Sequence, residues 1–406
     1  MGNAFSNQQI MARYLPLLDI ETVSFLERAV QAILASKRRG GKVVVATGSG
    51  PNLHEGVTTL IAELMTKGVI DGVLTSSAVI AHEMAGTLDK VKRVDGRQLG
   101  FGDDLLPKGF TFELTELTEN ALADLRHEME LDDELITRCR QAEGKVIIKA
   151  AGNMAYPMGL RSERLAREIL SLAHAYGLPF ETVAGWGADP RTMIGAAARQ
   201  GLPVLVSVPQ LVGGGAVGLA IADSSTITQR SMRVAEVLAS ADVIIESAVA
   251  LTQEIHDGPF ETYTGHGIWA TWDGYRTYSL ADKTLVRIDL DPNLKQAWLA
   301  ERQSQTVQEA INQGLPKTKL TGIPFRMEMS GFARLEGSLP VVGDIGVIWP
   351  VLACQVAEEL GIELDFVSHP QQTAEGKAMR EWIVEQVQPI NRELLFKTSR
   401  TFTQIR

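Results

Sequence analysis

The sequence predicts an α/β protein built on one doubly wound, mostly parallel sheet with helical excursions. Three observations predict this fold class. Short apolar runs rich in β-branched residues recur along the chain, and segments with apolar residues at helical spacing separate most of them. Such alternation is typical of a parallel sheet that helices cover on both faces. The third observation is that small residues, glycine above all, directly follow several of the apolar runs.

The individual elements follow from local patterns. A helix is predicted from Ile20 to Ser36, because apolar residues repeat there at helical spacing, and it ends before Gly40. The apolar runs predict strands at 42–48, 72–77, 145–151, 180–185, 203–209, 242–248, 285–291 and 339–344. Helical periodicity predicts helices at 55–67, 79–88, 162–176, 192–200, 228–238 and 350–360.

These elements divide the chain into three parts. We predict an N-terminal helical segment at 1–40, a single α/β core at 41–370 and a C-terminal helical tail at 371–406. The core has two excursions. Segment 109–143 is acidic, helical in pattern and without a predicted strand, whereas segment 314–337 is turn-rich and suits a lid.

Composition excludes several classes of protein. The 406 residues carry a formal net charge of −10, whereas nucleic-acid binders present clustered Lys and Arg to the phosphates. No apolar stretch approaches the ~20 residues of a membrane span, and the N-terminus lacks the pattern of a signal peptide. Cys139 and Cys354 form no CxxC motif and no metal-ligand spacing. We therefore expect a cytoplasmic protein with no nucleic-acid partner, no membrane contact and no metal site.

Small polar residues mark the ends of the predicted strands, where ligands of open parallel sheets bind. Their size allows close approach of a ligand to the backbone, and the helices that follow offer free N–H groups to an anion. The spacing is neither a GxGxxG nor a Walker A motif, and a plain turn with a helix cap, or a hinge at the glycine run, is the alternative. The candidate ligand-binding residues are Thr47, Gly48, Ser49, Asn52, Thr75, Ser76, Ser77, Gly213, Gly214 and Gly215.

Carboxylates also stand at strand ends. Asp289 and Asp344 follow the last two predicted strands and suit hydrogen bonds to a ribose hydroxyl. With the other acids at this edge, they favour a cationic amine substrate over an anionic one.

Two histidines occupy equivalent positions after neighbouring strands. His54 and His82 are each followed by Glu near the start of a helix. Neither has a second His at i+4, where Thr58 and Gly86 stand, so a zincin site is not supported. A contact with a ligand and a structural role are equally compatible with this pattern.

The densest ionisable cluster follows the strand at 242–248. Glu254, His256 and Asp257 suit general acid–base work, and Trp269 and Trp272 suit the enclosure of an amine. The alternative is a polar loop anchored by buried tryptophans.

These residues carry a resemblance to known families. The run from Lys42 to Leu88 resembles the opening of deoxyhypusine synthases, and the likeness continues at Gly213–Gly215, Gln253-Glu254 and Asp257-Gly258. The archaeal-type ornithine cyclodeaminase, or LOR/SDH, domain is similar around Asp289 to Pro292 and at Gly343-Asp344. In layout the likeness covers roughly residues 20–365.

The resemblance implies a Rossmann-like fold that binds NAD, with NADP as the other option, in a homo-oligomer such as a dimer or tetramer. It also implies transient oxidation at a C–N carbon of a small amine or amino acid, in deaminase, cyclodeaminase or amine-transfer chemistry. The lysine of the synthases' Trp-Gly-Lys segment is missing, since Trp272-Asp273-Gly274 stands at the nearest match. The resemblance therefore supports the NAD site more than aminobutyl transfer.

Three hypotheses follow. In the first, an NAD-dependent enzyme uses Glu254, His256 and Asp257 to bind the amine and move protons, with His82 and His54 as further catalytic candidates. In the second, the protein binds a nucleotide and regulates without turnover, because one fold hosts many functions. In the third, His54, His82, His256 and Asp257 serve a metal-dependent hydrolase, although their spacing carries no known ligand signature.

Overall fold

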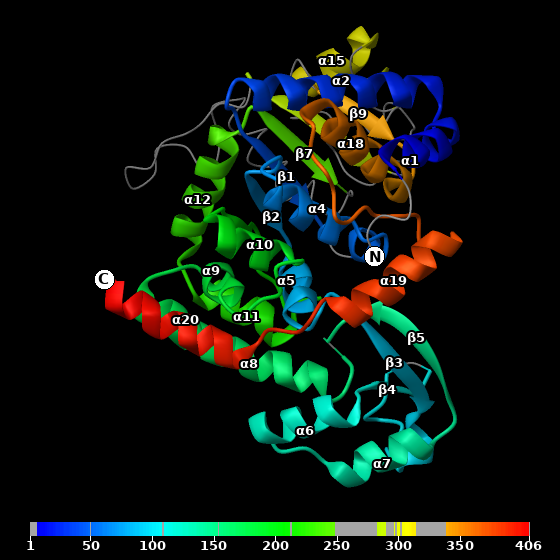
Figure 1. The fold of residues 1–406 in the computed structure, drawn as a ribbon, viewed down its shortest axis with the longest axis vertical. Helices are drawn as coiled ribbons and strands as arrows, with labels where there is room; N and C mark the ends of the chain where they lie inside the picture. The colour runs from blue at the N-terminus through cyan, green and yellow to red at the C-terminus, as the bar shows by residue number, and fades with distance from the viewer. Residues whose placement is uncertain are drawn as a thin grey trace.

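A six-stranded sheet, parallel throughout, forms the centre of the protein in its computed structural model (Figure 1). The structure describes residues 6–48, 50–107, 109–152, 154–211, 213–247, 282–289, 296, 299–300, 303–313 and 338–405. The strands are β1 (Val43–Thr47), β2 (Gly72–Thr75), β6 (Val204–Val206), β7 (Val243–Ser247), β8 (Thr284–Asp289) and β9 (Leu339–Val342). All six coincide with predicted strands.

The order of the strands defines where a ligand can enter the sheet. They lie side by side as β6-β2-β1-β7-β8-β9. From β1 the chain builds outwards through β2 to β6, then returns to the other side of β1 and builds outwards again from β7 to β9. This is the strand order of a Rossmann sheet, and the direction of building reverses between β1 and β7. The predicted doubly wound α/β fold is confirmed.

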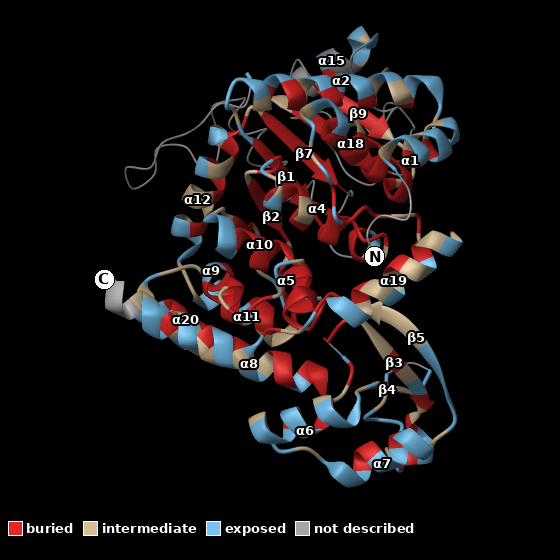
Figure 2. Ribbon diagram, viewed as in Figure 1, coloured by how far each residue is buried: buried red, intermediate tan, exposed pale blue. Residues whose placement is uncertain are grey.

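Alternate residues of each strand face opposite layers of helices. Val44 and Ala46 pack with the apolar side of α12 (Ile227–Ser240), whereas Val43 and Val45 belong to a larger core on the other face. Figure 2 shows β1 and β7 coloured as buried. The described helices that contribute to that larger core are α1 (Asn7–Tyr14), α2 (Ile20–Arg38), α4 (Val57–Thr66), α5 (Ser77–Met84), α8 (Met158–Tyr176), α9 (Phe180–Gly185), α10 (Met193–Gln200), α11 (Gly215–Asp223), α18 (Ile345–Leu360), α19 (Ala374–Gln386) and α20 (Arg392–Ile405). Strands buried on both faces explain why their sequences are continuous apolar runs.

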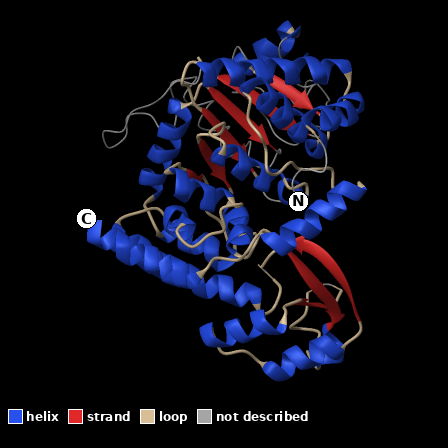
Figure 3. Ribbon diagram, viewed as in Figure 1, coloured by secondary structure: helices blue, strands red, loops and turns tan. Residues whose placement is uncertain are grey.

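A second, smaller sheet lies at the other end of the molecule (Figure 3). It is antiparallel, with the order β4-β3-β5. Its elements are β3 (Leu88–Asp95), β4 (Thr111–Thr115) and β5 (Gly144–Ala150), together with η2 (Gly96–Leu99), α6 (Glu119–Glu128) and α7 (Asp133–Gln141). The apolar face of the sheet packs with α6 and α7 in a separate core.

Three secondary-structure predictions were wrong, two of them in the small sheet. Segment 109–143 was predicted to lack a strand but contains β4, and the run at 145–151 forms β5 of the small sheet rather than a parallel strand. In β3 the buried side chains Leu88, Val91 and Val94 are spaced by three, which obscures the strand pattern. The predicted strand at 180–185 is helix α9, because a short buried apolar run does not distinguish the two structures.

The C-terminal tail packs on both parts of the molecule. Helix α19 (Ala374–Gln386) contacts β3 and β5, and α20 (Arg392–Ile405) contacts α9. The remaining short helices are η1 (Leu15–Leu17), α3 (Pro51–His54) and α15 (Gln305–Asn312). The excursion predicted at 314–337 lies outside the described residues. Within the described part of the chain, no helix combines the length and apolarity needed to cross a bilayer.

A buried hydroxyl joins three elements where the strand order reverses. Ser247, the last residue of β7, donates to Asn52 Oδ1 at 2.7 Å and accepts from Trp349 Nε1 at 2.8 Å. Asn52 Nδ2 also donates to the Ser247 carbonyl at 3.3 Å. Asn52 belongs to α3 and Trp349 to α18, and all three side chains are buried. One oxygen thus connects β7 to the loop after β1 and to α18.

Replacing this hydroxyl leaves two buried polar groups without partners. We expect Ser247→Ala to lower the free energy of unfolding by about 2–4 kcal/mol, since each such group costs about 1–3 kcal/mol. Urea denaturation of the purified variant measures the loss. The control is Ser240→Ala, an exposed serine on α12, which we expect to change stability by less than about 0.5 kcal/mol. Equal effects of the two substitutions would contradict the role of Ser247.

Candidate functional site

The carboxyl ends of β1 and β7 form the centre of the candidate site. Thr47 and Ser247 end these strands as register partners, and Gly48 follows Thr47 as a buried residue. Gly50 then has φ +67°, and a Cβ at this position would meet no atom of the described residues within 4 Å. The backbone at Gly50 is therefore open to a ligand, in a conformation that favours glycine.

One polar side chain at this edge is buried without a hydrogen bond. Thr47 Oγ1 has no partner among the residues that the structure describes, whereas the Thr47 carbonyl accepts from Thr75 Oγ1 at 2.9 Å. Asn52, a predicted ligand-binding residue, instead uses its amide on Ser247. Asn52 therefore positions the loop, while Thr47 has a hydrogen bond to offer.

The predicted serine and glycine residues meet at the neighbouring strand ends. Ser76 caps α5, accepting from Val79 N at 3.4 Å. Ser77 Oγ donates to the Gln210 carbonyl at 3.0 Å and accepts from Gln210 N at 3.2 Å. A Cβ on Gly214 would lie 2.7 Å from Ser77 Oγ. Glycine at 214 therefore allows α11 to pack closely against α5.

The other two glycines of this run have unusual backbone angles. Gly213 and Gly215 have φ +76° and +56°. The run thus carries a tight packing contact between the starts of α5 and α11, which brings both helix N-termini to the same edge. Its part in binding a dinucleotide stays a prediction.

The two predicted carboxylates are already engaged. Asp344 caps α18, accepting from Gly346 N at 2.9 Å and from Gln372 Nε2 at 3.2 Å. Asp289 is buried at the end of β8, 3.7 Å from Arg287 Nη2, and Glu246 of β7 lies 3.8 Å from Arg287 Nη1. The predicted site did not include Glu246 and Arg287, although a charge inside an apolar strand is a visible signal.

Four predicted site residues fall outside the described part of the chain. Ser49 was a cofactor-binding candidate, and Glu254, His256 and Asp257 were the first catalytic candidates. Their roles stay predictions.

His54 and His82 come together in a cluster between the two sheets, called here the histidine cluster. His54 ends α3, His82 lies in α5, Lys149 belongs to β5 and Arg380 to α19. His82 Nδ1 lies 2.8 Å from the Ala151 carbonyl. Arg380 Nη2 donates to the Ile148 carbonyl and lies 3.4 Å from His54 Nδ1.

The hydrogen-bond partners assign opposite tautomers to the two histidines. A carbonyl only accepts, so His82 carries its proton on Nδ1 and presents a lone pair on Nε2. A guanidinium only donates, so His54 accepts at Nδ1 and presents an N–H at Nε2. The pair therefore offers one proton acceptor and one donor.

Both imidazoles are neutral at physiological pH. Burial, together with the nearby Arg380, His82 and Lys149, lowers the pKa of His54 from 6.5 to about 4. Burial also lowers the pKa of His82, against the hydrogen bond to Ala151. Neutral imidazoles can accept protons without first losing one.

Three acidic residues lie close to the residues of this cluster. Lys149 Nζ is paired with Glu113 Oε2 at 2.5 Å, and Asp89 stands opposite Lys149 in the β3–β5 register. Burial raises the pKa of Asp89 to about 7. Glu55 accepts from Gln371 N at 2.7 Å and from its side chain at 2.9 Å, and burial raises its pKa.

Sequence reasoning missed the partners of the two histidines. The small sheet and α19 supply Asp89, Glu113, Lys149 and Arg380. No local motif joins these positions to His54, and only the fold brings them together. Within the described ranges, no three His, Cys, Asp or Glu side chains lie close enough to hold a metal ion.

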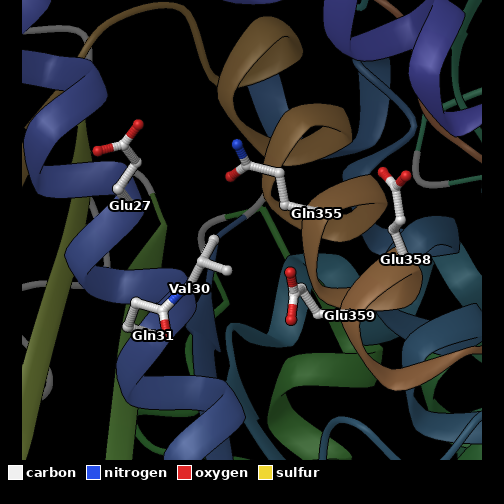
Figure 4. A pocket seen from close by; sticks show the side chains of 6 residues that line it. All are labelled: Glu27, Val30, Gln31, Gln355, Glu358 and Glu359. Carbon is white, nitrogen blue, oxygen red and sulfur yellow. The ribbon is translucent and has the colours of Figure 1, made fainter.

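A hollow of about 150 Å³ between α2 and α18 lies elsewhere (Figure 4). Its lining includes Glu358 and Glu359, which accept from Gln8 and Arg38. They stand in the last turns of α18, about 20 Å from Asp344 at 1.5 Å per residue. The hollow is therefore separate from the carboxyl edge of the sheet.

Comparison with known proteins shows only distant likeness. No family model matches the sequence, and no curated protein matches it. AgrE, solved as a ternary complex with ornithine and NAD+, is similar over 85% of this chain and 34% of its own, with 14% identity and a TM-score of 0.41. ArgZ, an arginine dihydrolase from the ornithine-ammonia cycle in cyanobacteria, is similar over 84% and 32%, with 12% identity and a TM-score of 0.39.

A LOR/SDH protein from Methanococcus maripaludis S2 is similar over 85% of this chain and 71% of its own, with 11% identity and a TM-score of 0.40. The present chain spans about a third of the length of AgrE and ArgZ. Likenesses this distant assign no family, substrate or cofactor. The resemblance to deoxyhypusine synthases stays a prediction.

The low pKa of His54 allows a test of whether the fold holds this histidine neutral. Between pH 6.5 and about 4, the unfolded chain binds a proton at this histidine and the folded chain does not. Stability that is present above pH 6.5 is therefore lost as the pH falls through this window. We expect the free energy of unfolding to fall more steeply in the wild type than in His54→Asn, which keeps an acceptor for Arg380.

Urea denaturation at four pH values between 7.5 and 4.5 measures the two profiles. Groups such as Asp89 titrate in both proteins and cancel in the difference. The matched control is His127→Asn, an exposed histidine on α6, whose profile should parallel that of the wild type. Parallel profiles for wild type and His54→Asn would show that His54 is not held neutral by the fold.

Proposed function

We propose that this chain binds NAD at the carboxyl ends of β1 and β7 and acts as an NAD-dependent enzyme. Its substrate is a small amine or amino acid, which is transiently oxidised at the carbon that bears nitrogen. The observation that carries the proposal is the reversal of strand order between β1 and β7, with the open backbone of Gly50 directly above it.

The residues at this edge fit a dinucleotide. A pyrophosphate needs close backbone approach and N–H donors, and Gly50 and the N-termini of α5 and α11 supply these at the same edge. The buried Thr47 hydroxyl offers one hydrogen bond. Bound NAD+ supplies a hydride acceptor.

The two histidines fit the proton movements of such a reaction. An amine enters as an ammonium ion and must lose a proton before its carbon can give up a hydride. His82 Nε2 has a lone pair for that proton, and His54 Nε2 has an N–H that can donate a hydrogen bond to the substrate. His54 is four residues from Gly50, and His82 five from Ser77, which places them about 6–8 Å along their helices from the edge.

NAD binding tests the location of the site. We expect Gly50→Ala to weaken the affinity for NAD+ at least tenfold, because its Cβ would stand where the dinucleotide approaches. The control is Gly40→Ala, which also has a positive φ (+75°) and open space around its Cβ but lies before β1. Calorimetric titration of both variants with NAD+ and NADP+ measures the affinities. Failure of the wild type to bind either dinucleotide at millimolar concentration would refute the proposal.

Turnover separates an enzyme from a nucleotide-binding regulator. Single-turnover formation of NADH on adding an amine or amino acid detects oxidation even if the hydride later returns. We expect His82→Gln to slow this step at least 100-fold with unchanged NAD+ affinity, since general-base catalysis contributes about 10²–10⁴-fold. His127→Gln is the control. NAD binding without turnover on any such compound would favour the regulatory hypothesis.

A further inference from the structure

We propose that Arg380, with His54 beside it, binds the carboxylate of the substrate, so that the substrate is an amino acid rather than a diamine or polyamine. This inference rests on the proposed function and narrows its substrate class. Arg380 reaches the histidine cluster from α19, a helix of the C-terminal tail.

Arg380 lacks the counter-ion that other buried arginines of this protein have. Arg161 pairs with Glu128 at 2.7 Å, and Arg230 pairs with Glu181 at 2.8 Å. In contrast, Arg380 is half-buried and forms no ion pair with any residue that the structure describes. Its hydrogen bonds within the described part of the chain are both made by Nη2, to the Ile148 carbonyl and to His54. Its buried Nε–H has no partner in the described ranges.

A guanidinium in this situation calls for an anion. Burial of a charge without a partner is costly, and for Arg380 it lowers the pKa of the guanidinium. A guanidinium N–H donates a short, charge-assisted hydrogen bond to a carboxylate. Both N–H groups of Nη2 are used by Ile148 and His54, so the accessible donors of Arg380 that remain for a carboxylate are the two N–H groups of Nη1.

The acids around Arg380 do not fill this role. Glu55 acts on Arg380 electrostatically but stands beyond ion-pair distance, with its oxygens occupied by Gln371. Glu113 is committed to Lys149 and to Arg93 at 2.7 Å. Among the described residues of this cluster, the cation that remains for a ligand is Arg380.

The position of this site matches the chemistry of an amino acid. The carbon that bears the amino group is bonded directly to the carboxylate carbon. A carboxylate held by Arg380 therefore places that carbon close to His54, at the end of the short helix that begins after Gly50. A diamine has no group that would use Arg380.

Matched pairs of ligands test this inference in the full chain. L-Ornithine and putrescine, and L-arginine and agmatine, differ only by the carboxylate. We expect the wild type to bind each amino acid at least tenfold more tightly than its decarboxylated partner, as measured by calorimetric titration with and without saturating NAD+. Arg380→Gln should remove this preference, and Arg380→Lys should restore part of it. NAD+ affinity should not change, and the control Arg167→Gln, at an exposed position on α8, should keep the preference.

The outcomes separate the two proposals. Equal or tighter binding of the diamines by the wild type overturns the carboxylate site, even if NAD+ binds and the diamines are oxidised. Absence of any amino-acid binding overturns it as well. Tighter binding of the amino acids without NAD+ binding supports the carboxylate site and refutes the NAD-dependent function. If Arg380→Gln does not fold, comparison of the two ligand pairs with the wild type and with Arg380→Lys still tests the carboxylate site.

Discussion

The hydroxyl of Ser247 sets the geometry on which the candidate site depends. The strand order leaves the ends of β1 and β7 side by side, but this alone does not fix the loop that follows β1. Asn52 fixes it through two hydrogen bonds to Ser247, and Trp349 brings the start of α18 to the same oxygen. Because Asn52 lies in the single turn of α3, its position also determines where His54 points. A small residue with both a donor and an acceptor is needed at 247, since a larger one would not fit between two strand ends and an indole.

The joint between the two sheets is the second constraint. His82 holds the Ala151 carbonyl just after β5, and Arg161 joins Glu128 of α6 to the Ile390 carbonyl of the C-terminal tail. Both contacts are buried or partly buried hydrogen bonds, made by the neutral imidazole of His82 and by the charged guanidinium of Arg161. Such hydrogen bonds are strong only in one arrangement of the groups. The parallel sheet therefore supplies the edge at which we propose that a dinucleotide binds, and the small sheet with α19 supplies Lys149 and Arg380 of the histidine cluster. A change in the joint would move Arg380 and Lys149 relative to His54 without altering either sheet.

The parallel sheet was predictable because its strands are buried on both faces, and burial leaves a continuous apolar run such as Val43–Thr47 in the sequence. The small sheet was not predictable, because charged and apolar residues alternate irregularly in its strand β3. This strand also pairs with segments that are distant in the chain. The same reason limits prediction of the site. Local patterns located Thr47, Gly213 and both histidines at strand ends. They did not locate Arg380, which reaches His54 across 326 positions of sequence.

The distribution of charge favours a zwitterion over a simple cation as the proposed ligand. The sequence placed acidic residues near the carboxyl edge, which favoured a cationic amine. In the structure Asp344 is engaged by the N-terminus of α18, and Asp289 shares Arg287 with Glu246. These carboxylates therefore already have hydrogen-bond or ion-pair partners before any ligand arrives, while Arg380 has no ion-pair partner among the described residues. A ligand that is only cationic would meet that guanidinium as a repulsive neighbour. A ligand that also carries a carboxylate turns the same group into an anchor, and it leaves the neutral imidazoles free to handle the proton of its amine.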